Sequence, residues 1–319
     1  MSYPDPRFYP GSQGPLWYPG MDDNQPLIER MRHRYLTGSE LFKEAFHVFK
    51  EKPSYYFLLM LLVYLPIQIV LQYQSMQLDL SVESYELLGM QLLRFGMVEM
   101  VVMLLEQVAV LVIAVIACYY VERTDPVLSA KVGEDGQVAP APTETFQTLF
   151  YRGVRMWPRA VLTLVVVLFG VISAVMLLSS MMLMPLLGLF AMVGMVLLVI
   201  LVSLLQSCTA TTAALRGRMA FDNIRYVFFI LQGRMWRSMG VFAFISFITS
   251  VFSIVFSLLT TLLLGGIENV AVSFTVSVVI TTLLSVVQLY GYTVGALLFI
   301  GAEHRKERII KDEMPQAGT

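Results

Sequence analysis

Six runs of apolar residues, each about as long as a bilayer is thick, dominate this 319-residue sequence. A helix of about 20 apolar residues crosses the hydrocarbon core and satisfies its backbone hydrogen bonds internally. Hydrophobic residues make up 57% of the chain and charged residues only 14%, against about 25% charged in a soluble domain. We therefore predict an all-α polytopic membrane protein with six transmembrane helices, at residues 54–73, 100–121, 159–181, 186–207, 239–264 and 271–301.

The distribution of lysine and arginine predicts the orientation of these spans. Seven precede the first span, five lie between the second and third, five between the fourth and fifth, and four follow the sixth. Only Arg94 of the 22 falls on the other side. Because positive residues concentrate in cytoplasmic loops, we expect both ends of the chain in the cytoplasm.

The regions that flank the spans predict three parts. Residues 1–36 are rich in proline, glycine and aromatic residues, and we expect a disordered cytoplasmic tail there. This tail is interpreted either as a docking segment for an unknown protein partner or as a solvated leader. Residues 37–308 form the predicted membrane domain, and residues 309–319 form a disordered C-terminal tail.

A short amphipathic segment precedes each odd-numbered span, which indicates a threefold repeat. The apolar positions are Phe42, Ala45, Phe46 and Phe49, then Phe146, Leu149, Phe150 and Gly153, then Ile224, Val227, Phe228 and Leu231. Spacing of i, i+3, i+4 and i+7 places such residues on one face of a helix. We predict three units, each an interfacial helix followed by a transmembrane hairpin. Chance recurrence in an apolar chain is the alternative.

Aromatic residues near these segments are the predicted interfacial anchors. The second and third copies share the sequence Arg-Met-Trp, which places Trp157 and Trp236 where an indole anchor belongs. Phe46, Phe150 and Phe228 are the matching phenylalanine anchors. Thr37 and Glu40 predict a capping box at the start of the first interfacial helix.

Small residues recur four apart in the later spans and predict close helix packing. They are Ser203, Ser207 and Thr211 in the fourth span, Ser253, Ser257 and Thr261 in the fifth, and Ser273, Ser277, Thr281, Ser285, Gly291 and Gly295 in the sixth. Such stripes let helix backbones approach in lipid. The same stripe is also typical of a homodimer interface, so both interpretations stay open.

One ionisable residue, Glu106, falls inside a predicted span. Glu99 lies seven residues earlier on the same face, and Gln107 directly follows Glu106 in the sequence. An intramembrane carboxyl faces the protein interior or a wet cavity. It is either a relay for protons or cations or a carboxyl bonded within the bundle, and its expected partners are Gln68, Gln72, Gln288 and Tyr290.

A search for catalytic and cofactor motifs finds none. The sequence has no phosphate-binding loop, no His-Glu-x-x-His, no Gly-x-Ser-x-Gly and no Cys-x-x-Cys. We therefore predict no catalytic residues, no metal and no cofactor. The net charge of −1 gives no indication of a nucleic-acid partner.

The repeated segments, with Phe150 and Phe228 ahead of an Arg-Met-Trp start to the next span, resemble a bacterial family. It is the six-span membrane domain found on some glycerophosphodiester phosphodiesterases and as stand-alone proteins. The catalytic half of those enzymes, with its His-Arg-Gly and Glu-Asn motifs, has no counterpart here, so the resemblance transfers no site residue. It implies a non-enzymatic module in the bacterial plasma membrane that anchors or regulates partners in cell-envelope or lipid biology. The alternative is a small transporter or channel that uses Glu106.

Overall fold

The computed structural model describes residues 27–79, 85–123, 131–132, 138–139, 144–182, 185–264 and 270–313. In these ranges the chain is helical apart from short connections and the antiparallel pair β1 (Lys131–Val132) and β2 (Val138–Ala139). The helices are α1 (Leu27–His33), α2 (Gly38–Glu51), α3 (Pro53–Leu59), η1 (Met60–Tyr64), α4 (Leu65–Asp79), α5 (Tyr85–Arg123), α7 (Phe146–Met182), α8 (Pro185–Arg216), α9 (Ala220–Leu231), α10 (Met235–Leu264) and α11 (Val270–Glu313). Six stretches of the described chain are long and apolar enough to cross a membrane, in agreement with the predicted multi-pass helical membrane protein.

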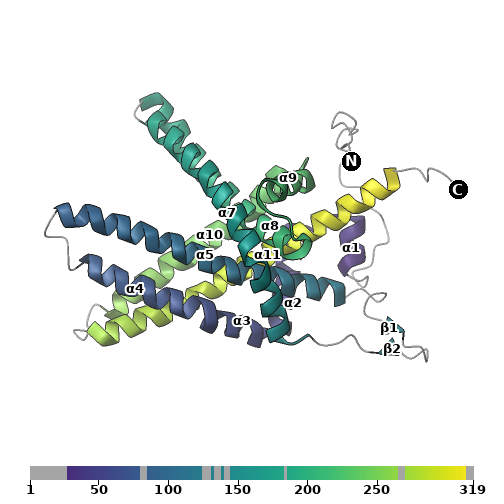
Figure 1. The fold of residues 1–319 in the computed structure, drawn as a ribbon, viewed down its shortest axis with the longest axis horizontal. Helices are drawn as coiled ribbons and strands as arrows, with labels where there is room; N and C mark the ends of the chain where they lie inside the picture. The colour runs from purple at the N-terminus through teal and green to yellow at the C-terminus, as the bar shows by residue number, and fades with distance from the viewer. Residues whose placement is uncertain are drawn as a thin grey trace.

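Helix α5 is the centre of the bundle. More than half of its apolar window, 56%, is buried inside the protein, against 28% or less for each other candidate span. Ile113 and Ala114 of α5 are fully buried, as are Leu204 of α8 and Leu297 of α11. The α7–α8 hairpin packs on α5 near one end of the molecule and diverges from the other spans toward its turn (Figure 1).

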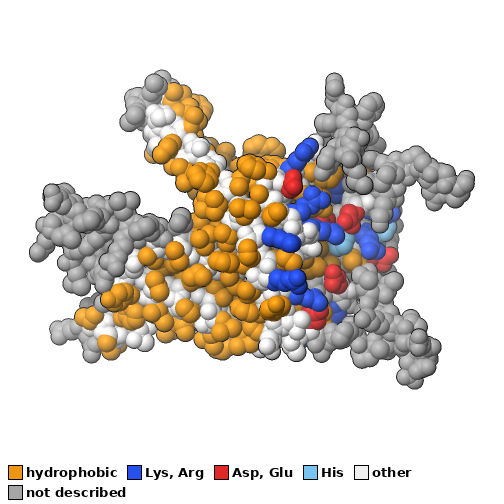
Figure 2. Space-filling view, in the orientation of Figure 1, with side chains coloured by type: hydrophobic (Ala, Val, Ile, Leu, Met, Phe, Trp, Pro, Cys, Tyr) orange, Lys and Arg blue, Asp and Glu red, His pale blue; other side chains and the backbone are white. Residues whose placement is uncertain are grey.

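The outer surface of the spans is apolar. Met176 of α7, Phe190 of α8 and Leu262 of α10 are each at least 70% exposed, and hydrophobic side chains cover most of the visible face (Figure 2). Exposing such surface to water costs about 25 cal/mol for each Å². Lipid is the environment that removes this cost, in agreement with a membrane location.

Small residues bring α11 close to its neighbours. A Cβ atom on Gly291 would lie 2.9 Å from Cγ2 of Ile245 in α10, and one on Gly295 would overlap the Ser207 hydroxyl of α8 and approach the Phe242 ring. The packing interpretation of the predicted stripe therefore holds at Gly291, Gly295 and Ser207.

Two of the three predicted interfacial segments are separate helices. The first and third are the separate helices α2 and α9. The second is not separate, because residues 146–157 continue through Pro158 into the span as the single helix α7. Proline removes one backbone hydrogen bond from a helix interior, and two contacts with α5 hold this part of α7 in place. The Trp157 indole N–H donates to the Leu104 carbonyl at 2.8 Å, and Gly153 lies directly against Val112.

The structure is helical inside both predicted tails, so each ordered region extends further toward its end of the chain than predicted. Residues 1–26 are outside the described part, but Leu27–His33 forms α1, with Met31 fully buried against Gly301 of α11. Helix α11 continues to Glu313, past the predicted boundary at residue 309. These ends are ordered because they pack on one another, which composition alone does not reveal.

A charged platform, made of α1, α2, α9 and residues 302–313 of α11, occupies one end of the molecule (Figures 1 and 2). Among the described residues its ion pairs are Arg30–Glu44 at 2.7 Å and Arg34–Glu40 at 2.6 Å, and Arg216 at the end of α8 pairs with Glu303 at 2.9 Å and Glu307 at 2.8 Å. Exposed ion pairs contribute only about 0–1 kcal/mol each. Glu303, however, is only 2% exposed and also accepts a 2.6 Å hydrogen bond from Tyr226, so the acid at the centre of this network is buried.

Candidate functional site

Glu106 in α5 is bonded by two tyrosines from other spans. The Tyr64 hydroxyl donates to its Oε1 at 3.0 Å, and the Tyr292 hydroxyl of α11 donates to the same oxygen at 2.9 Å. The second oxygen, Oε2, forms no hydrogen bond with any described residue. Two phenol donors stabilise a carboxyl that would otherwise be costly in the hydrocarbon, and one oxygen stays available.

A short π-helix positions Tyr64. Pro66 has no backbone N–H and therefore cannot donate to the Leu62 carbonyl four residues earlier. The preceding turn widens into η1, where the Leu65 N–H donates to the carbonyl of Met60. Pro66 therefore accounts for the π-turn that precedes it. Such turns are frequent at functional sites.

The other predicted members of this site are arranged differently. Gln107 is 2% exposed, and its Nε2 has no partner among the described residues. The Glu99 side chain lies outside the described part of α5. Tyr290, an expected partner of Glu106, instead donates to the Phe42 carbonyl of α2 at 2.7 Å.

Neither tyrosine that bonds Glu106 is among the partners predicted from the sequence. Tyr64 and Tyr292 lie in apolar spans, where a buried hydroxyl needs a hydrogen-bond partner. Because Glu106 is an intramembrane acceptor on another span, the unpaired tyrosine hydroxyls of apolar spans could have been predicted as its partners. Of the glutamines predicted as partners, Gln288 lines a nearby cavity without bonding Glu106.

A polar cavity of about 250 Å³ adjoins this cluster, between α8, α10 and α11. Its polar lining residues are Ser203, Gln206, Ser246, Thr249, Ser250, Gln288 and Tyr292. The side chains of Gln206 and Gln288 form no hydrogen bond with described residues. A cavity of this size with such a lining holds several water molecules. Tyr292 joins it to Glu106, since this residue lines the cavity and its hydroxyl bonds the carboxyl.

The predicted anchors divide into exposed and packed side chains. Phe46, Phe228 and Trp236 are 58%, 41% and 75% exposed, as a group in contact with lipid headgroups requires. Phe150 is partly buried beside Phe146, with ring centroids 5.6 Å apart. Trp157 ties α7 to α5 through its hydrogen bond to the Leu104 carbonyl.

The described residues contain no cluster of three or more His, Cys, Asp or Glu that could hold a metal ion. Comparisons with protein-family models, with curated proteins and with solved structures find no match for this chain. Its function must therefore be inferred from its own residues.

Proposed function

We propose that this chain is a non-enzymatic multi-pass membrane module that anchors or regulates a protein partner through the charged platform. The observation that supports it is the construction of the platform. Helices from both ends of the described chain meet there, with Met31 fully buried against Gly301 and the buried Glu303 carboxylate paired with Arg216. A rigid surface beside the membrane loses little conformational freedom when a partner binds.

The positive-inside rule supports a cytoplasmic position for this platform and for both chain ends. The pattern resemblance to the membrane domain of bacterial glycerophosphodiester phosphodiesterases supports the bacterial plasma membrane, and cell-envelope or lipid biology as the setting. Residues 1–26 precede α1 directly, so a docking tail would act beside the same surface. A homodimer through the small-residue stripe is compatible with this role.

Site-specific photocrosslinking in cells tests the proposal. A crosslinking amino acid replaces Lys43 or Asp222, both exposed on the platform, and in matched controls replaces Leu189 or Leu262 on the apolar surface. We expect protein adducts of defined mass at the platform positions only, and fewer of them after deletion of residues 1–26. Absence of adducts at both platform positions contradicts the module.

The second candidate is a small transporter or channel. Its specific support is Tyr292, which connects the intramembrane carboxyl of Glu106 to the polar cavity. Substitution of Glu106 by glutamine separates the two candidates, because a relay requires a change of charge and a structural carboxyl does not.

A further inference from the structure

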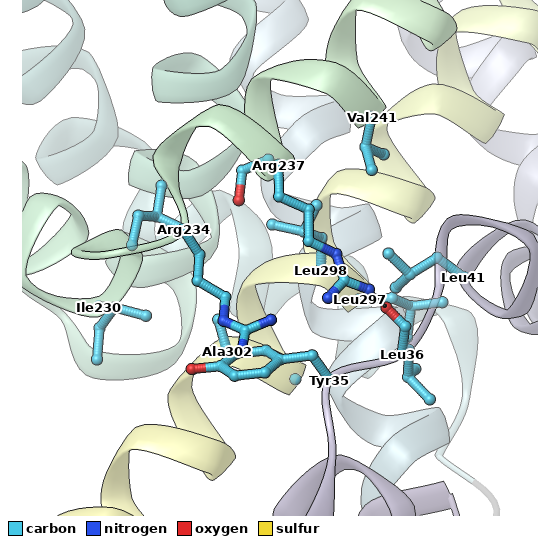
Figure 3. Close-up of a pocket in the computed structure, with 13 residues that line it drawn as sticks. Tyr35, Leu36, Leu41, Ile230, Arg234, Arg237, Val241, Leu297, Leu298 and Ala302 are labelled. Atoms are coloured by element: carbon cyan, nitrogen blue, oxygen red, sulfur yellow. Dashed lines mark hydrogen bonds between the residues drawn. The ribbon is translucent and has the colours of Figure 1, made fainter. Parts of the chain in front are cut away.

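A small pocket lies where α10 begins, at the boundary between the charged platform and the apolar spans (Figure 3). Its walls come from the segment before α2, from the end of α9, from the first turns of α10 and from α11. Two cations of the Arg-Met-Trp region, Arg234 and Arg237, extend into it toward Tyr35 and Leu36 (Figure 3). The volume is about 40 Å³. One water needs about 10–15 Å³ of such space, so the pocket admits about three oxygen-sized atoms.

Both arginines are held in place without a carboxylate in an ion pair. The Arg234 guanidinium lies 3.9 Å from the centroid of the Tyr35 ring, and Nη2 of Arg237 donates to the Leu36 carbonyl at 2.8 Å. Neither forms an ion pair with a described residue, whereas Arg30 and Arg216 both pair with glutamates. Each guanidinium has five N–H donors, so several remain for a ligand. Two adjacent like charges beside an apolar wall favour an anion between them.

Ser238 supplies an independent indication of a ligand. It lines the pocket and is only 5% exposed, yet its hydroxyl forms no hydrogen bond with a described residue. A hydroxyl that is unpaired on the wall of a pocket is free to bond a ligand there. Helix α10 also begins here, at Met235, so the positive end of its dipole faces the same place.

The remaining features indicate which anion fits. Trp236, 75% exposed, marks the depth of the lipid headgroups. The other side of the pocket is apolar, with Val241 of α10 and Leu297 and Leu298 of α11. A ligand with an oxyanion at one end and a hydrocarbon chain at the other matches both parts.

We propose that this pocket binds the phosphate of an anionic membrane lipid. Arg234 and Arg237 donate to the phosphate oxygens, the Ser238 hydroxyl completes the set, and an acyl chain runs along Val241 and Leu298. Guanidinium groups match the planar, paired geometry of phosphate oxygens. A free phosphate ion shares the oxyanion chemistry but has nothing to place on the apolar wall. The site does not depend on the partner proposal, since it is measured on purified protein.

Native mass spectrometry of the full chain in mild detergent tests the site. The protein is titrated with phosphatidylglycerol, with phosphatidylcholine, and with inorganic phosphate as competitor. We expect one retained phosphatidylglycerol, at least about tenfold preferred over phosphatidylcholine, and little competition from millimolar phosphate. Equal retention of the two lipids overturns the proposal, and so does binding of inorganic phosphate without any lipid preference.

Variants locate the binding. The double substitution Arg234→Gln and Arg237→Gln should weaken retention by about tenfold or more, and Ser238→Ala by a few-fold. The matched control is Arg218→Gln, because Arg218 also lies over a tyrosine ring, 4.1 Å from the centroid of Tyr226, but outside the pocket. Unchanged retention in the double variant, or an equal loss in the control, overturns the assignment. If the double variant does not fold, Arg234→Gln alone, which removes a single exposed stacking contact, replaces it.

Discussion

At the scale of single residues, an acidic side chain inside a span needs donors from other helices. A charged carboxyl at the centre of a bilayer costs about 2.5–3.5 kcal/mol on insertion scales. Glu106 meets this requirement through Tyr64 and Tyr292. The sequence predicts that Glu106 needs partners within the bundle, but not which ones, because the partners depend on how η1, α5 and α11 rotate against each other.

Substitution of Glu106 distinguishes a structural carboxyl from a relay. Glutamine keeps an oxygen that accepts from both phenols, so we expect Glu106→Gln to leave expression, thermal stability in detergent and cellular function near wild type. Leucine leaves Tyr64 and Tyr292 without their acceptor, and each orphaned hydroxyl should lower the free energy of unfolding by about 1–3 kcal/mol. A folded Glu106→Gln protein that fails to complement a deletion strain would favour the transporter.

At the scale of elements, the apolar runs predict that helices exist but not where they end. The second predicted interfacial segment is continuous with α7, because Gly153 and Trp157 fix it to α5. Helix α1 forms because Met31 is covered by α11. Both results depend on contacts between residues far apart in the chain, which local periodicity does not contain.

The contact between α5 and α7 depends on the absence of a side chain at Gly153. A Cβ atom there would lie 2.7 Å from Cγ2 and 3.0 Å from Cα of Val112. We therefore expect Gly153→Ala to destabilise the protein by about 1–3 kcal/mol, measured as thermal unfolding in detergent. The matched control is Gly170→Ala in the same helix, where nothing lies within 4 Å. That change should be neutral or stabilising, by up to about 1 kcal/mol from helix propensity. Equal effects of both changes would contradict close packing at Gly153.

The start of α2 should respond to acid. The predicted capping box is present, with the Thr37 N–H donating to Glu40 at 2.7 Å. Burial raises the pKa of Glu40, but the hydrogen bonds from Thr37 and the charges of Arg34 and Arg30 outweigh it, so the pKa lies below its ordinary value of 4.5. A lowered folded-state pKa stabilises the fold above the ordinary pKa, and this contribution is lost as the pH falls through the lowered value.

Unfolding measured between pH 7 and pH 3 tests this dependence. We expect wild type to lose stability relative to Glu40→Gln as the pH falls below about 4.5, because glutamine has no proton to bind. Thr37→Ala should remove about 1 kcal/mol at neutral pH through loss of the cap. A constant difference between wild type and Glu40→Gln across this range would rule out the proposed ionised cap.

At the scale of the whole molecule, the six spans follow from the sequence because the bilayer imposes a fixed length on each of them. The separation of charge follows as well, since Lys and Arg gather at one end of the described chain (Figure 2). The divergence of the α7–α8 hairpin and the cavity beside Tyr292 cannot be predicted from the sequence. Both depend on which apolar helices pack together, and many apolar helix surfaces are similar.

Cysteine labelling in intact cells tests the orientation. Gln147 and Gln232 are exposed at the platform end, and Val270, 62% exposed, begins α11 at the opposite end. The native thiols of Cys118 and Cys208 are both free, so alanine replaces them first. A membrane-impermeant maleimide should label Val270→Cys in intact cells, and should label Gln147→Cys and Gln232→Cys only after the membrane is opened. The physical reason is the retention of positive charge on the cytoplasmic side during insertion. Labelling of Gln232→Cys in intact cells would place the platform outside the cell, where no cytoplasmic partner could reach it. That result would contradict the proposed module.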